Sequence, residues 1–174
     1  MSNTSIPLYN LGGLSASELD KLLSEIRSTD YIAEVSSGEV EPEQSGLWDQ
    51  VLPIPTELLQ SSTDIAQIKE VEGSAGDQEK LAEHALSVLE SDERTKGKYA
   101  NGGLVVVDKR TKSGDGSLLV LQILSKGSDK KVVDSMRCAP RSLIEVCSNL
   151  AVANMGLADY KNMCGNAEVF DAGQ

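Results

Sequence analysis

The strongest pattern in the chain is a pair of apolar runs within residues 104–124. Residues 104–107 and 118–124 are rich in β-branched and aliphatic side chains. Gly114 and Gly116 lie between the runs and supply the positive φ angles that a turn requires. The pattern therefore predicts an antiparallel β-hairpin, with Lys109, Arg110 and Lys112 near its tip.

The apolar residues of this hairpin follow one another without alternation, which is typical of strands that are buried on both faces. Two strands alone are barely stable in water. We therefore expect a third strand at residues 132–133, an edge strand at residues 52–54, where Pro53 is tolerated, or helices that cover one face.

A short amphipathic helix is predicted near the start of the chain. Ser15 and Glu18 have the spacing of a capping box, in which each side chain bonds the backbone amide of the other residue. The apolar positions that follow lie on one helical face and are Leu19, Leu22, Leu23 and Ile26. A helix of about three turns is marginal in water. This stripe must therefore pack on its own domain or dock on a partner protein.

The segment after this helix has the composition of a linker. Residues 34–50 are acidic and contain Ser, Gly and Pro, but few apolar residues. Such a linker would leave the preceding helix free to reach a partner. Trp48, the only tryptophan, interrupts the stretch and is expected to anchor it against a surface of the protein itself or of a partner.

The remaining helices are predicted from apolar stripes. A weak pattern begins at residue 57, a clearer one follows residue 63, and wide stripes predict helices at 78–91 and from 141 to 155. A short helix is expected at 157–164, because Gly156 and Gly165 flank it. Cys147 lies inside the most apolar stripe and is interpreted as a small core residue.

These elements predict an α+β protein in two parts. Residues 1–56 form an acidic, partly extended N-terminal arm that contains the short amphipathic helix. Residues 57–174 form the core domain, a small antiparallel hairpin or sheet packed with helices. At 174 residues, one domain with an appended arm is the expected organisation.

Charge supports this division. Residues 1–76 carry 13 acidic and 3 basic residues (−10), whereas residues 94–141 carry 11 basic and 4 acidic residues (+7). Two interpretations remain open, simple solvated faces and two interaction surfaces of opposite sign. The open end of the hairpin is predicted to gather a surface for anions, formed by Lys96, Lys98, Lys126, Lys130 and Lys131.

Several classes of function lack support in the sequence. No set of nucleophile, base and orienting residue is recognisable, and the single histidine, His84, is interpreted as a surface or packing residue. The three cysteines have neither a CxxC spacing nor a nearby histidine, which argues against a disulfide framework and a zinc site. No metal and no cofactor are predicted. The absence of a signal-like or membrane-spanning run predicts a cytoplasmic or other reducing intracellular location.

The leading hypothesis is a non-enzymatic interaction or assembly protein. Leu19, Leu22, Leu23, Ile26 and Trp48 would contact a protein partner, and the basic residues would contact an acidic protein surface or a nucleic-acid backbone. A nucleic-acid partner has weaker support, because only Tyr99 supplies an aromatic ring near the lysines. Self-association is left open and a membrane partner is not predicted. The alternative is a small-molecule-binding or enzymatic domain with a cleft between sheet and helices.

Overall fold

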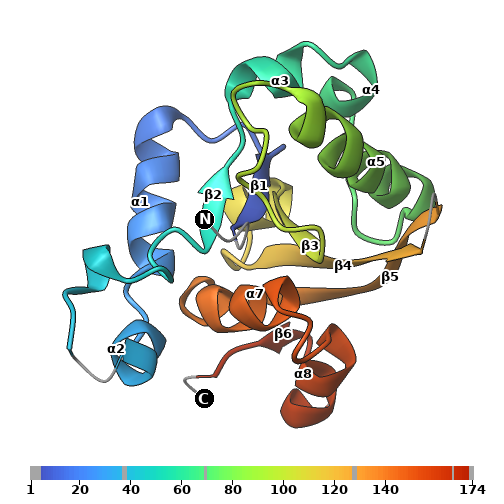
Figure 1. Ribbon diagram of the computed structural model, residues 1–174. Coiled ribbons are helices and arrows are strands. Elements are labelled where there is room, and N and C mark those ends of the chain that lie inside the picture. The colour runs from blue at the N-terminus through green and yellow to red at the C-terminus, as the bar shows by residue number, and fades with distance from the viewer. Residues whose placement is uncertain (1–4, 37–38, 69, 127–128, 166, 173–174) are drawn as a thin grey trace.

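The computed structural model describes residues 5–36, 39–68, 70–126, 129–165 and 167–172. One mixed six-stranded sheet, in the order β2-β1-β3-β4-β5-β6, forms its centre (Figure 1). The strands are β1 (Ile6–Asn10), β2 (Val51–Pro53), β3 (Gly103–Val107), β4 (Leu118–Lys126), β5 (Asp129–Cys138) and β6 (Val169–Phe170). The β3-β4-β5 stretch is antiparallel and the other pairings are parallel.

Eight α-helices occur within the described residues and cover both faces of the sheet. They are α1 (Ala16–Ile26), α2 (Tyr31–Ser36), α3 (Thr56–Gln60), α4 (Thr63–Ala66), α5 (Ala75–Ser91), α6 (Lys109–Ser113), α7 (Leu143–Ala151) and α8 (Leu157–Cys164). Side chains of α1, α2, α7 and α8 share one apolar core with the sheet, and those of α3, α4 and α5 share the other. None of the described helices is long and apolar enough to cross a membrane.

This architecture refines the predicted fold class. The mixture of helices and strands and the antiparallel pairing of β3 with β4 are confirmed. The predicted small antiparallel sheet is corrected to a six-stranded mixed sheet of an α/β protein, covered on both faces. The apolar run in β3 is unbroken because all five of its residues are buried between the two helical layers.

The start of the predicted N-terminal arm is part of the central sheet where the structure describes it. Residues 6–10 form β1, which lies between β2 and β3 in the sheet. Pro7 makes this strand hard to see in the sequence, because proline has no N–H to give to a strand ladder. The register with β3 begins only at Leu8, which pairs with Val105, so Pro7 precedes that paired stretch.

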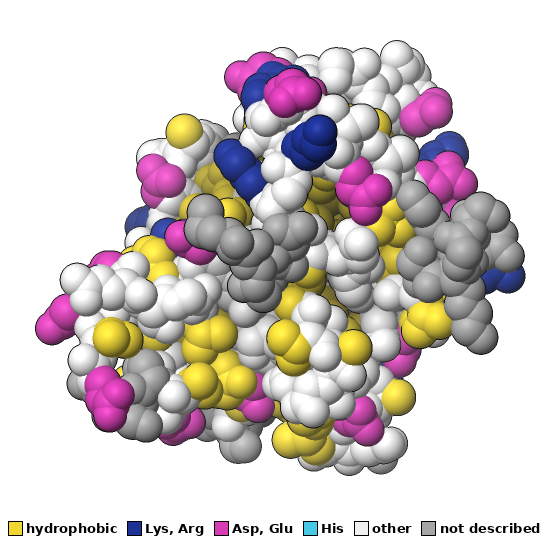
Figure 2. Space-filling model, in the orientation of Figure 1, with side chains coloured by type: hydrophobic (Ala, Val, Ile, Leu, Met, Phe, Trp, Pro, Cys, Tyr) yellow, Lys and Arg dark blue, Asp and Glu magenta, His cyan; other side chains and the backbone are white. Residues whose placement is uncertain are grey.

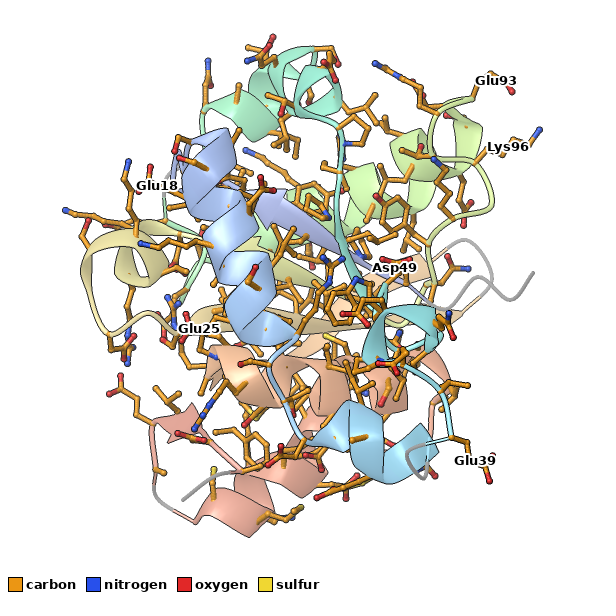
Figure 3. The ribbon with its side chains drawn as sticks, turned by 90° about the vertical axis from the view of Figure 1, so that its left-hand side faces the viewer. Glu18, Glu25, Glu39, Asp49, Glu93 and Lys96 are labelled. Carbon is orange, nitrogen blue, oxygen red and sulfur yellow. The ribbon has the colours of Figure 1, made fainter. Side chains whose placement is uncertain are left out.

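The prediction of a partly extended arm is also corrected, because the helix of this segment packs against the sheet. Ser15 and Glu18 do form the capping box that starts α1, as the sequence predicts. The stripe of α1 then packs on its own domain, since Leu22, Leu23 and Ile26 are buried in the same core as β1 and β2. Figure 3 shows α1 along the side of the molecule, with Glu18 near its start and Glu25 near its end. The predicted boundary after residue 56 therefore divides the strands of one sheet.

Candidate functional site

Polar side chains from several segments meet at the carboxyl end of β3. Asp108 directly follows this buried strand and caps α6, because its carboxylate accepts a hydrogen bond from the Thr111 amide and the Thr111 hydroxyl binds the Asp108 amide. β1 ends beside β3, and its connection to β2 crosses one face of the sheet while the connection from β2 to β3 crosses the other. Such reversal points are where open α/β sheets bind ligands.

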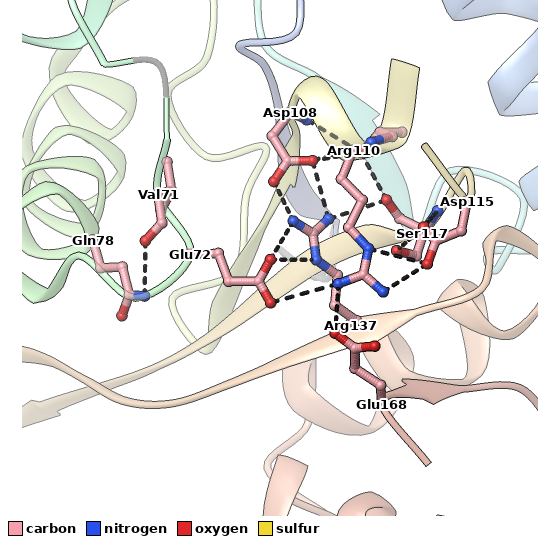
Figure 4. Close-up of polar contacts among 10 residues, drawn as sticks. Val71, Glu72, Gln78, Asp108, Arg110, Asp115, Ser117, Arg137 and Glu168 are labelled. Carbon is pink, nitrogen blue, oxygen red and sulfur yellow. Dashed lines mark hydrogen bonds and ion pairs between the residues drawn. The ribbon is translucent and has the colours of Figure 1, made fainter. Parts of the chain in front are cut away.

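Arg137, near the end of β5, holds this edge of the sheet together (Figure 4). Its side chain is only 3% exposed and forms an ion pair with Asp108, which is 7% exposed. The guanidinium also donates to Glu72 Oε2 from Nε at 3.0 Å and from Nη2 at 2.7 Å, and to the Ser117 carbonyl from Nη1 at 3.2 Å. With the two bonds to Asp108 this makes five, which matches the number of N–H groups of an arginine.

The protonation of this cluster follows from its contacts. Burial alone would raise the pKa of Asp108, but the hydrogen bonds and charge of Arg137, helped by Thr111, bring it below its ordinary value. Burial opposes the charge of Arg137 in the same way, and its bonds to Asp108 and Glu72 raise its pKa overall. Both groups are therefore ionised at neutral pH, as a buried ion pair requires.

Arg110 forms a second, more exposed cluster beside the first. It donates to Asp115 from Nε at 3.0 Å and from Nη2 at 2.6 Å, and to Glu168 from Nη1 at 2.9 Å. The bonds to Asp115 and Glu168 raise the pKa of Arg110, and those from Arg110 and Ser117 lower the pKa of Asp115. Glu72 joins the two clusters, because its other oxygen lies 3.9 Å from Arg110 Nη1.

An open cleft of about 580 Å³ lies over these clusters, and we call it the carboxyl-edge cleft. The segment before α5 and the segment around α6 form its two walls, and Arg137 lies between them. Its lining residues are Glu70, Val71, Glu72, Asp108, Lys109, Arg110, Ser113, Gly114 and Arg137. The volume is in the range of small-molecule sites, and charged groups from three separate segments meet there.

The sequence contained two signals for this site. Asp108 follows a buried strand at a capping position, which places a carboxylate at a strand end. Arg137 stands between Met136 and Cys138 in a strand, and a charged residue at such a position needs a buried partner. The identity of that partner is not visible in the sequence, because Glu72 and Asp108 lie 65 and 29 residues away.

The structure places the predicted docking residues against the protein itself. Leu22, Leu23 and Ile26 are buried, while Leu19 and Trp48 are partly buried and pack on the same core. The Arg27 guanidinium carbon lies 4.9 Å from the centre of the Trp48 ring, and Arg27 Nε donates to the Trp48 carbonyl at 2.9 Å. These side chains are therefore used in the protein's own core and do not form a free surface.

The predicted lysine surface stays a prediction. Lys96, Lys98 and Lys131 are exposed, and Lys96 projects from the loop before β3 in Figure 3. The side chains of Lys126 and Lys130 lie outside the described residues. On the face shown in Figure 2, basic side chains are scattered and do not form one patch. Of the residues expected at the hairpin tip, Lys109, Arg110 and Lys112 belong to α6.

The other chemically active side chains are packed in the interior. His84 is buried on α5, as a packing residue, and its Nδ1 lies 2.7 Å from the Tyr9 hydroxyl. Its Nε2 makes no hydrogen bond of ordinary geometry with a described residue. Cys147 is buried in the core as expected, and this burial raises the pKa of its thiol. No group of three or more potential ligands in the described part of the chain is arranged to hold a metal ion.

The comparison with protein families matches most of the chain. The model of a family described as "Domain of unknown function (DUF6924)" matches residues 48–172. This stretch includes every residue of the carboxyl-edge cleft, whereas β1 and α1 precede it. No curated protein and no solved structure matches the chain.

Proposed function

The chain is a member of the DUF6924 family, and for this member we propose a role as a non-enzymatic module that binds a small charged molecule in the carboxyl-edge cleft. The observation that carries the proposal is the cleft of about 580 Å³ at the end of β3, with charged side chains from three segments in its lining. Proteins place ligand sites at such strand ends because loops and helix starts converge there.

Burial of the α1 stripe favours this function over a docking helix. A helix that presents Leu22 and Ile26 to a partner would have to leave a core in which they are 9% and 1% exposed. Exposing a buried aliphatic side chain costs about 1.5–3 kcal/mol per residue. A role in binding within the cleft requires no such rearrangement.

The chemistry of the lining favours binding over catalysis. The lining residues that the structure describes include neither a histidine nor a cysteine, and the Asp108 carboxylate already accepts hydrogen bonds from Arg137 and Thr111. A general base needs a free lone pair and a pKa near the working pH. The lowered pKa of Asp108 makes it a weak base and suits it to hold Arg137.

The proposal is tested by NMR titration of the full-length protein with a library of small carboxylates, phosphates, amines and amino acids. We expect at least one compound to shift the amide signals of Glu72, Lys109 and Ser113 in a saturable manner. For a compound with an acidic group, Arg110→Gln should weaken that binding, and Tyr99→Phe, outside the cleft, should leave it unchanged. Absence of saturable shifts at the cleft across the library would refute the function.

A second candidate, binding of a protein partner, is favoured by one feature of β5. Its outer edge pairs with β6 only at Arg137 and Cys138, so the backbone of residues 131–136 lies at an edge of the sheet. Val133 is 50% exposed there, and Lys131 is exposed beside it. Sedimentation of the wild type and of Val133→Lys over a wide concentration range tests this. Self-association that the substitution abolishes supports the candidate, and a monomer throughout refutes pairing between copies.

A further inference from the structure

Two charged side chains in the lining of the carboxyl-edge cleft are not used by the fold. Glu70 and Lys109 are both exposed, and neither forms an ion pair with a residue that the structure describes. Every other charged residue of the lining belongs to the Arg137 or the Arg110 cluster. Unpaired charges at the mouth of a cleft are available to a ligand.

The two free charges belong to opposite walls. Glu70 stands with Glu72 on the segment that precedes α5, and Lys109 stands with Arg110 on α6. One wall therefore carries two carboxylates, and the other carries two cations beside the Asp108 that Arg137 neutralises. Figure 4 shows the approach of Glu72 to Arg137 from one side and the Arg110 cluster on the other. The lining residues that the structure describes include three acidic and three basic ones, so their charges sum to zero.

From this separation of charge we infer that the ligand is a zwitterion of the amino-acid type. Its ammonium group meets Glu70, which stands beside Glu72, and its carboxylate meets Lys109, which stands beside Arg110. A simple anion would face the acidic wall and a simple cation the basic wall, so each would meet repulsion that the zwitterion avoids. The inference rests on the proposed function and names its ligand class.

Matched probes test both ends of the ligand. The set of free L-amino acids is first screened by thermal shift with the full-length protein. The best binder is then compared with its N-acetyl derivative, which lacks the positive charge, and with its carboxamide, which lacks the negative charge. We expect each blocked form to bind about two- to fivefold more weakly, because it loses an ion pair at an exposed position. Equal affinity of the free and a blocked form would overturn the inference for that end.

Single substitutions assign each end to a wall. Glu70→Gln should weaken binding of the free amino acid and of its carboxamide, and leave the N-acetyl form unaffected. Lys109→Gln should weaken binding of the free and N-acetyl forms and spare the carboxamide. Neither residue supports the fold through an ion pair, so both variants should fold normally. Glu90→Gln and Lys98→Gln change the same charges outside the cleft and serve as controls.

The outcomes separate this inference from the function on which it rests. If a charged library compound binds at the cleft but no amino acid does, the cleft is a binding site and the zwitterion is wrong. If neither an amino acid nor any other library compound binds there, both proposals fail. If Glu70→Gln instead weakens binding of the N-acetyl form and spares the carboxamide, the ligand binds in the opposite orientation and the assigned orientation is wrong.

Discussion

The two ends of β3 carry clefts of nearly equal size and very different chemistry. The carboxyl-edge cleft has about 580 Å³, and a cleft of about 550 Å³ lies around the segment that leads into β3. Of the lining residues that belong to the described part of the chain, six of nine are charged in the first cleft, and only Glu90 is charged in the second. The second, which we call the amino-edge cleft, is bounded by small residues and by Tyr99, whose hydroxyl donates to the Pro53 carbonyl at 3.1 Å.

This difference shows that volume alone does not distinguish a ligand site from another cleft of nearly the same size. At the carboxyl ends, loops and helix starts bring capping carboxylates and their partners together, as Asp108 and Arg137 illustrate. At the amino end, close packing dominates. A Cβ on Gly102 would lie 2.4 Å from the Leu150 carbonyl oxygen, a distance that real Cβ atoms do not reach. Each cleft therefore has its own most sensitive residue.

The largest effect is expected from Arg137→Met in the carboxyl-edge cleft. The substitution leaves the buried Asp108 carboxylate without its cation, and loss of one partner of a buried ion pair costs about 3–5 kcal/mol. Urea unfolding at neutral pH measures the loss. The double variant Asp108→Asn, Arg137→Met keeps a capping side chain and removes both charges, so it should recover part of the stability. A single variant as stable as the wild type would contradict the role given to Arg137.

The next effect compares glycines at the two edges. A Cβ on Gly12 would lie 2.7 Å from the Asp108 carbonyl oxygen, and one on Gly102 even closer to Leu150. Both contacts are with backbone, so Gly12→Ala and Gly102→Ala should each destabilise by about 1–3 kcal/mol, the usual cost of overpacking. Thermal unfolding measures both variants. Gly46→Ala, where nothing lies within 4 Å, is the control and should match the wild type.

A smaller, pH-dependent effect is expected from His84, which lines neither cleft. Burial lowers the pKa of His84, and the backbone of Leu58 opposes this shift only in part. The unfolded chain therefore binds the proton more readily than the folded protein. The free energy of unfolding should be highest above pH 6.5, the ordinary pKa of histidine. It should fall as the pH drops below 6.5 towards the lowered pKa of His84.

His84→Leu isolates this contribution. It should flatten the stability profile between pH 6.5 and about 5, the range above that in which carboxylates such as Glu18 and Asp108 begin to bind protons. The further loss at lower pH, where paired carboxylates become protonated, should persist. The measurement is urea unfolding at a series of pH values. An unchanged slope in the variant would show that another group titrates there.

The smallest effect on stability is expected from Arg110→Gln. Arg110 is 26% exposed and its partners Asp115 and Glu168 are 43% and 76% exposed, so solvent screens these pairs. Exposed ion pairs contribute about 0.2–1 kcal/mol. The same urea experiment at low and high salt should show this small difference shrink as salt is added. A loss as large as that of Arg137→Met would remove the distinction between the buried and the exposed arginine.

Local patterns in the sequence identified much of the secondary structure. The capping box of Ser15 and Glu18, the antiparallel apolar runs and the helix at 157–164 are all present. Each depends on residues a few positions apart, or on an unbroken apolar composition. The segment read as a hairpin turn contains α6, because the Asp108 and Thr111 capping box competes with the turn that the glycines suggest.

The amino-acid sequence by itself determined where α1 and α8 begin, that β3 and β4 are apolar antiparallel strands, and that most of the acidic charge lies in the first half. Only the tertiary structure decided that β1 lies inside the sheet, that α1 packs on its own domain, and that Glu72, Asp108 and Arg137 meet. The physical reason is the length scale of the interactions. Caps and apolar periodicity act between neighbours in the chain, whereas strand order and ion pairing join residues that are far apart in sequence and are brought together only by folding.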